Sequence, residues 1–152
     1  MHYLDHAATT PVPAEVAQAM MDVLTHHFGN PSAQYPLGQE AKRLVDRCRA
    51  TVAAALGCKS ERLFFTSCGT EASALAIYGT VYAKPRRFGN RIITTDCEHP
   101  SVEEAMKKLE ADGLEVVRIP TKNGVLDTEA AIAALEVPPL LVSMMMVNNE
   151  TG

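Results

Sequence analysis

Aromatic residues are scarce in this sequence, making up 5% of the chain, and tryptophan is absent. Proteins that bind single-stranded nucleic acid stack the bases on aromatic side chains, so few such platforms are available here. The formal net charge is -4, and lysine and arginine nowhere cluster densely enough to follow a phosphate backbone. Both features argue against nucleic acid as a partner.

The sequence also lacks the patterns of metal sites, membrane spans and secretion signals. The four cysteines (Cys48, Cys58, Cys68 and Cys97) show no Cys-x-x-Cys spacing, and no histidine pair completes a ligand set, so we expect no metal site. No run of about 18 apolar residues could cross a bilayer, and residues 1–10 lack the apolar core of a signal peptide. We therefore expect a cytoplasmic protein with reduced thiols and no membrane contact.

Apolar residues recur at helical spacing in two N-terminal segments. The first segment begins at Pro13, a residue tolerated in a first helical turn, and ends before the Gly-Asn-Pro-Ser sequence at 29–32. The second runs from Gly38 to Leu56 and places Cys48 on its apolar face. These patterns predict two helices, the second with a buried side.

From Leu63 onward, short apolar segments alternate with helical patterns. The apolar segments predict strands at residues 62–66, 91–95, 115–119 and 140–147. One helix is predicted to start at Thr70. Two more are predicted after the cap residues Ser101, where Glu104 would complete a capping box, and Asp127. This alternation predicts an α/β fold with a mostly parallel sheet and helices on both faces.

A turn rich in small residues, at 66–71, follows the first predicted strand and opens a helix. Gly69 lets the backbone approach a ligand closely, Thr70 adds a hydroxyl donor, and the helix N-terminus favours an anion. The turn therefore suits a phosphate. The alternative is an ordinary helix cap without a ligand, and this segment alone favours that alternative.

Two more polar clusters follow later predicted strands. His99 could stack on a flat cofactor and shuttle protons, although a lone loop histidine is the more common case. Asn148 and Asn149 could donate hydrogen bonds to a ligand or simply form a turn. Because the carboxyl ends of parallel strands meet at one edge of a sheet, the three clusters together favour a ligand site. Such a cluster directly before Gly152 also leads us to expect that the natural protein is longer.

Five motifs resemble those of the cysteine desulfurases of the class V aminotransferase family. They occur in that family's order, with similar spacing, at residues 4–11, 28–32, 65–71, 98–99 and 147–152. Cys68 and Ala74 depart from the family pattern, in which glycine and asparagine are usual. The resemblance implies an N-terminal portion of a pyridoxal-phosphate (PLP) enzyme. Residues 1–30 would pack on a small domain, and residues 31–152 would form part of the PLP-binding large domain of PLP-dependent transferases.

The resemblance also implies roles for particular residues. Thr70 and the backbone around Gly69 would hold the PLP phosphate. His99 would stack on the pyridine ring and take part in proton transfer, and Asn149 would hydrogen-bond near the 3-hydroxyl or the substrate. The loop at residues 8–9 and Asn30 would lie near the substrate entrance.

The implied reaction converts L-cysteine to L-alanine and passes the sulfur to an enzyme thiolate as a persulfide. A sulfur-acceptor or scaffold protein would then receive it, for example in iron–sulfur cluster assembly, and the full-length enzyme would be a homodimer. We assign none of the four cysteines as this thiolate. Cys97 lies near His99 in the sequence, but we interpret it as a small apolar residue packed at the end of a strand.

The family's Schiff-base lysine and persulfide cysteine have no counterpart up to Gly152, so we expect this chain alone to be inactive. Two alternatives stay open. The protein could be a selenocysteine lyase or another class V PLP enzyme. It could instead be a truncated, non-catalytic remnant that acts through a partner chain.

Overall fold

The computed structural model describes residues 2–83 and 89–152. The chain divides into two compact units, Met1–Phe65 and Thr66–Gly152, called here the N-terminal and the C-terminal unit. This division differs in kind from the predicted boundary at residue 30, which separates residues that would pack on a small domain of the full-length enzyme from those of its large domain. That boundary stays a prediction.

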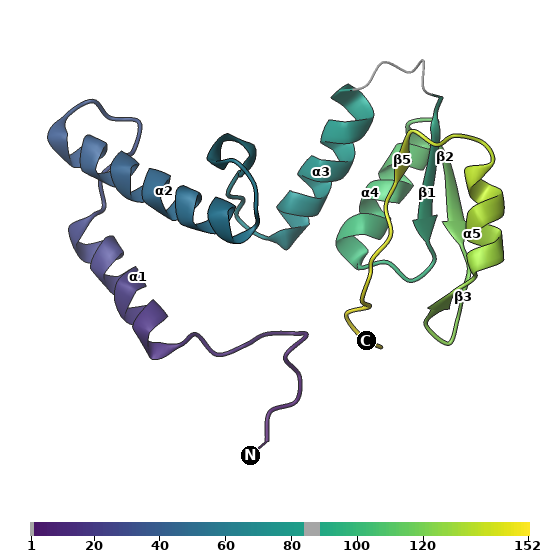
Figure 1. Cartoon of the computed structure of the whole chain (residues 1–152), viewed down its shortest axis with the longest axis horizontal. Helices are drawn as coiled ribbons and strands as arrows, with labels where there is room; N and C mark the ends of the chain where they lie inside the picture. Colours follow the sequence, from purple (N-terminus) through teal and green to yellow (C-terminus); the bar gives the residue numbers. More distant parts are fainter. Residues whose placement is uncertain (1, 84–88) are drawn as a thin grey trace. The chain divides into compact units, whose positions relative to one another are not determined.

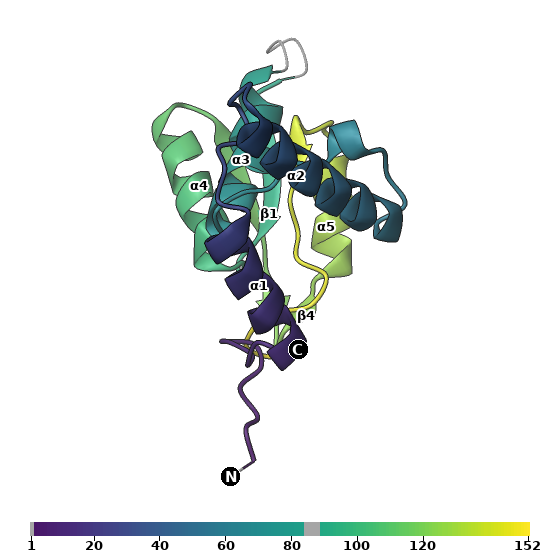
Figure 2. The same ribbon diagram turned by 90° about the vertical axis from the view of Figure 1, so that its left-hand side faces the viewer.

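The N-terminal unit contains the helices α1 (Ala14–His26) and α2 (Pro36–Ala55) and the short 3₁₀ helix η1 (Ser60–Arg62) (Figure 1). Figure 2 shows α1 in purple and α2 in dark blue, joined by an irregular connection. Both predicted helices are confirmed, and α2 starts earlier than predicted because Pro36 occupies its first turn. The prediction of a buried face around Cys48 is wrong, since Cys48 is exposed and the buried residues of α2 are Gly38, Ala41 and Ala53.

The connection between α1 and α2 depends on two close backbone approaches. A Cβ atom on Gly29 would lie 2.4 Å from the carbonyl oxygen of Leu37, and one on Gly38 would lie 2.4 Å from that of Ala33. Real Cβ atoms do not approach an oxygen so closely, so larger residues would force the connection apart. These glycines therefore fix the path of the chain between the two helices.

The predicted strand at residues 62–66 is wrong. Leu63 has extended backbone angles, but no strand pairs with this segment among the described residues. Phe64 is 73% exposed, and the Arg49 guanidinium donates to the Leu63 carbonyl oxygen at 2.7 Å and lies over the Phe65 ring. An apolar segment becomes a strand only where a neighbour satisfies its backbone groups.

The C-terminal unit is built on a parallel sheet with strand order β2–β1–β5. The strands β1 (Arg91–Thr95) and β2 (Glu115–Ile119) have the predicted bounds, whereas β5 (Leu141–Val142) is shorter than the predicted 140–147. The three strands run in the same direction, as the alternation of strands and helices predicted.

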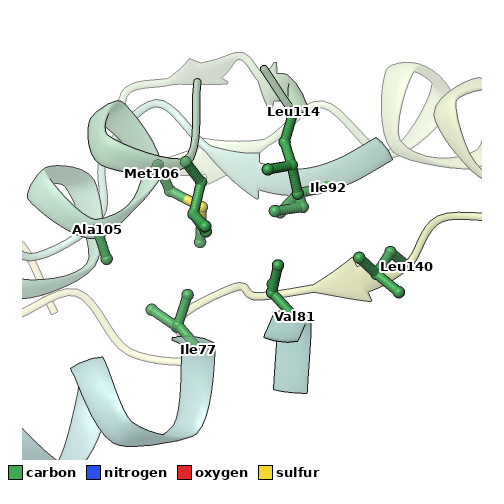
Figure 3. Packing of buried hydrophobic residues seen from close by; sticks show 8 residues of the cluster. Ile77, Val81, Ile92, Ala105, Met106, Leu114 and Leu140 are labelled. Atoms are coloured by element: carbon green, nitrogen blue, oxygen red, sulfur yellow. The ribbon is translucent and has the colours of Figure 1, made fainter. Parts of the chain in front are cut away.

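Helices cover both faces of this sheet, which confirms the predicted fold class. The helices α3 (Gly69–Ala83) and α4 (Pro100–Ala111) pack on one face, and α5 (Thr128–Leu135) packs on the other (Figure 1). Ile92 and Ile93 of β1 point to opposite faces, as successive strand residues do. Figure 3 shows the larger of the two cores, where Ile92 lies among Ile77, Val81, Met106 and Leu140.

A two-stranded hairpin of β3 (Thr121–Lys122) and β4 (Val125–Leu126) follows the sheet strand β2 and was not predicted. Its turn residues Asn123 and Gly124 both have positive φ angles, 52° and 78°. The Asn-Gly dipeptide is the strongest short-range signal for such a turn, so the sequence did contain the information. The Asp96 carboxylate accepts hydrogen bonds from the Thr121 N–H at 3.0 Å and hydroxyl at 2.7 Å, which ties the hairpin to the segment after β1.

Within residues 2–83 and 89–152, no helix is both long and apolar enough to cross a membrane. The same residues contain no group of three or more histidine, cysteine, aspartate or glutamate side chains placed to hold a metal ion.

Candidate functional site: a pocket at the carboxyl edge of the sheet

A pocket of about 570 Å³ lies where β1 and β5 end and α3 and α4 begin. It brings together three residues that the sequence had singled out: Gly69, Thr70 and His99. The remaining lining residues are Ser73, Glu98, Ser101, Val102, Ser143, Met144 and Met145. The carboxyl edge of a parallel sheet is the usual place for a ligand in α/β folds.

The turn before α3 is organised by a carboxylate that folds back from the first helical turn. The Ser67 N–H and hydroxyl both donate to the same Glu71 oxygen, at 2.6 and 2.7 Å. These two hydrogen bonds, from the backbone first, lower the pKa of Glu71. The turn therefore has a fixed conformation at the start of α3, where Gly69 and Thr70 meet the pocket.

Cys68 lies in the same turn, and its surroundings favour the charged form of its thiol. Its sulfur accepts a hydrogen bond from the Ser67 hydroxyl at 3.8 Å, and the backbone N–H groups of Glu71 and Thr70 add favourable interactions with the thiolate. These donors lower the pKa of the thiol, as expected at a helix N-terminus. An anion next to Gly69 and Thr70 would find the same stabilising environment.

His99 is the N-cap residue of α4. Its Nδ1 atom accepts a hydrogen bond from the Ser101 backbone N–H at 3.1 Å and lies 2.8 Å from the Ser101 hydroxyl oxygen. The prediction that Ser101 caps this helix in a capping box with Glu104 is wrong, because the imidazole takes the cap and Glu104 pairs with Lys107 at 2.7 Å. The cap therefore lies two residues earlier than predicted, and Pro100 occupies the first helical position.

Glu98 connects the two strands that border the pocket. One of its carboxylate oxygens accepts hydrogen bonds from the Thr95 hydroxyl at 2.7 Å and from the Met145 backbone N–H at 2.9 Å. The carboxylate thus holds the end of β1 against the segment after β5. Sequence reasoning missed this role, although Glu98 stands beside His99 in one of the five motifs.

Asn148, rather than Asn149, anchors the polar cluster after β5. The Asn148 amide nitrogen donates to the Cys97 carbonyl oxygen at 2.9 Å, and its amide oxygen accepts from the Glu150 and Thr151 N–H groups. Asn149 is exposed in the turn that results and is not among the residues lining the pocket. The structure therefore does not bring Asn149 to Thr70 and His99, and its proposed contact with a ligand stays a prediction.

A second hollow of about 360 Å³ adjoins the first and shares three of its residues: Thr70, His99 and Ser101. Its other lining residues are Ala74, Tyr78, Pro100, Glu104 and Ala105. The His99 ring and its partner Ser101 therefore form part of the wall of both hollows.

The larger pocket fits a phosphate attached to a flat ring. Hydroxyl side chains capable of donating to phosphate oxygens line it, namely Thr70, Ser73, Ser101 and Ser143, beside the start of α3. Val102 and Met144 provide apolar surface, and His99 an aromatic ring. No lysine or arginine lines the pocket in the part of the chain that the structure describes, so neutral donors and the helix N-terminus would carry phosphate binding.

The chain matches the family model "Aminotransferase class-V" over residues 2–152, and it therefore belongs to the class V aminotransferase family. It is 40% identical to the putative cysteine desulfurase IscS 1 of Bacillus subtilis, over 99% of this chain and 40% of that protein. It is also 40% identical to the cysteine desulfurase IscS of Dictyoglomus turgidum, over 99% of this chain and 38% of that protein. The chain thus spans about two fifths of the length of these relatives.

Solved structures agree with the fold. A NifS-like protein superposes with a TM-score of 0.88 and 34% identity over 97% of this chain and 41% of its own. SspA in complex with cysteine superposes with a TM-score of 0.85 and 28% identity over 99% of this chain and 43% of its own. The family is PLP-dependent, and the parallel sheet with its flanking helices is the part of its fold that this chain contains.

Proposed function

We propose that the protein containing this chain is a PLP-dependent cysteine desulfurase, which converts L-cysteine to L-alanine and passes the sulfur to an enzyme persulfide. The proposal rests on one observation: Gly69, Thr70 and His99 line the same pocket at the carboxyl edge of the sheet. The relatives named as cysteine desulfurases support the choice of reaction.

The start of α3 would hold the phosphate of the cofactor. Thr70 would donate its hydroxyl, and Gly69 would let the backbone N–H groups approach the phosphate oxygens. The lowered pKa of Cys68 supports this assignment, because the same turn already stabilises negative charge on the thiol. Asn149 would contact the cofactor or the substrate only if the turn at residues 148–151 took a conformation different from the one described above.

His99 would stack against the cofactor ring and take part in proton transfer through Nε2, since its Nδ1 atom is used by the α4 cap. When bound, PLP supplies an electron sink for the α-carbon of an amino acid. Glu98 would fix the segment containing Met144 and Met145, which closes the pocket on the side of β5. These roles require no lysine or cysteine of this chain.

Further parts of the proposal concern the whole protein. We propose a cytoplasmic homodimer whose sulfur goes to an acceptor or scaffold protein. The complex of SspA with cysteine, a structural relative, supports L-cysteine as the substrate.

An assay of the whole protein that contains this chain, with PLP and L-cysteine, tests the proposal. We expect equal amounts of alanine and protein-bound or released sulfur, and a loss of both in Thr70→Val and His99→Gln. Selenocysteine serves as the competing substrate, because a lyase specific for selenium would prefer it. Pyruvate or pyridoxamine phosphate as the main product, without sulfur release, would show transamination and contradict the proposal.

A further inference from the structure

We infer that Ser101 is a positioning residue that keeps His99 in the tautomer with its proton on Nε2 and holds the ring in the wall between the two hollows. The catalytic consequence rests on the proposed function. The geometry of the pair does not, since every contact involved lies within the C-terminal unit.

Two groups of Ser101 converge on a single atom of His99. The backbone N–H donates to Nδ1 at 3.1 Å, and the hydroxyl oxygen lies 2.8 Å from the same nitrogen. Because the N–H needs the lone pair of Nδ1, this nitrogen carries no proton, and the hydroxyl can only donate to it as well. The proton of a neutral ring must then be on Nε2.

The position of the ring at a helix start strengthens this preference. Serine, threonine, aspartate and asparagine are the usual N-cap residues because their oxygen accepts from the first-turn N–H groups. Here Pro100 has no N–H, so Ser101 supplies the first available donor of α4, and the imidazole accepts it in place of an oxygen. A proton on Nδ1 would face that donor and the positive end of the helix, and it would open the cap.

The position of His99 and Ser101 in the pocket walls links the tautomer of His99 to ligand binding. His99 and Ser101 line both the hollow of about 570 Å³ and the one of about 360 Å³, so the ring orientation shapes both. With Nδ1 used by the cap, Nε2 is the one ring nitrogen left to meet a ligand. Proton exchange between His99 and a ligand therefore runs through Nε2, and moving a proton to Nδ1 is coupled to release of the first turn of α4.

Nitrogen-15 NMR of the histidine side chains in the full chain measures the tautomer directly. The spectra are recorded at alkaline pH, where imidazole rings are neutral, and His99→Gln identifies the His99 signals. We expect the Nε2–H tautomer to dominate in the wild type. In Ser101→Ala, which keeps the backbone donor but loses the hydroxyl, the ratio of tautomers should fall by roughly threefold to tenfold, the effect of one neutral hydrogen bond.

Two further variants keep the test falsifiable. Ser101→Thr restores a hydroxyl at the same position and should return the ratio towards the wild-type value. Ser73→Ala removes another hydroxyl that lines the larger pocket, and it should leave the His99 signals unchanged. An unchanged ratio in Ser101→Ala, or a dominant Nδ1–H form in the wild type, would overturn the inference.

The readout is independent of cofactor binding. Binding of pyridoxamine 5′-phosphate, which carries the cofactor ring and phosphate but no aldehyde, tests the proposed phosphate site separately. If this compound fails to bind while the ratio of tautomers in Ser101→Ala shifts as expected, the proposed function fails and the inference stands. If the phosphate compound binds and the ratio does not change, the inference fails and the proposed function stands.

Discussion

The Glu98 carboxylate accepts a hydrogen bond from the backbone N–H of Met145 at 2.9 Å, and so joins residues 47 positions apart in the chain. The same oxygen accepts from the Thr95 hydroxyl at the end of β1. Because the segment after β5 has no strand on its outer side within the described residues, this carboxylate is a main link between that segment and the sheet. The shape of the pocket wall at Met144 and Met145 therefore depends on a side chain outside β5.

Replacing Glu98 tests this link. Glu98→Ala leaves the Thr95 hydroxyl and the Met145 N–H without their acceptor, and we expect a loss of about 1–3 kcal/mol in the free energy of unfolding. Amide hydrogen exchange at Met145 should accelerate at the same time. Glu104→Ala is the matched control, because it removes a surface ion pair with Lys107 from the same unit and should cost less than about 1 kcal/mol. Equal effects of the two substitutions would contradict the assigned role.

The two adjacent asparagines should respond differently to alanine substitution. Asn148→Ala removes the bond to the Cys97 carbonyl and both acceptor contacts in the turn, so we expect about 1–3 kcal/mol of destabilisation. Asn149→Ala alters an exposed side chain and should change stability by less than about 0.5 kcal/mol. Denaturant unfolding of both variants provides the comparison. A larger loss in Asn149→Ala than in Asn148→Ala would show that the turn is arranged differently.

The thiol of Cys68 should react unusually fast at neutral pH. Its pKa is lowered by the Glu71 backbone N–H and the Ser67 hydroxyl, so a larger fraction is thiolate than in an ordinary cysteine. The rate of alkylation against pH should therefore have a midpoint below that of N-acetylcysteine, and Ser67→Ala should move the midpoint upward. Peptide mass spectrometry assigns the rate to Cys68. A midpoint at or above that of N-acetylcysteine would rule out the stabilising turn.

The ion cluster between α4 and β2 predicts a pH dependence of stability. Arg118 donates to Glu110 at 2.6 and 2.9 Å, and these bonds lower the pKa of Glu110 below its ordinary value of 4.5. The folded chain thus holds this proton less tightly than the unfolded chain, so the stabilisation is complete above pH 4.5 and is lost as the pH falls through the lowered pKa.

Glu110→Gln should therefore reduce the melting temperature at about pH 7, and the difference between the two proteins should shrink as the pH falls below 4.5 and the wild-type carboxyl takes up its proton. Thermal unfolding of both proteins over this range gives the difference directly. A difference that is constant across the range would mean that the carboxylate charge is not involved.

The sequence was sufficient for features that depend on local pattern. The bounds of β1 and β2, the Asp127 cap of α5 and the parallel sheet all agree with the structure, since alternation, capping side chains and apolar runs determine them locally. The pattern also placed His99 after a strand and Gly69 and Thr70 at the start of a helix, and the structure brings these three residues into one pocket.

The features that could not be predicted depend on contacts between distant segments. Residues 63–65 have a strand-like composition but no pairing partner among the described residues, and Cys48 has a helical apolar position but no covering element there. The cap at His99 was missed because serine is the commoner cap residue, and only the structure shows the imidazole accepting from Ser101. The links made by Glu98 and Asn148 span about fifty residues and leave no local signal.

Binding of pyridoxamine 5′-phosphate, compared with pyridoxamine, tests the central claim most directly. Both compounds carry the cofactor ring but no aldehyde, so neither can react with surface lysines, and the difference between them reports the phosphate site alone. We predict that the phosphate compound binds at least about tenfold more tightly, the effect of one or two hydrogen bonds to a charged group, and that Thr70→Val removes most of this difference. Equal affinity of the wild type for the two compounds, measured by calorimetry, would contradict a phosphate site at Gly69 and Thr70.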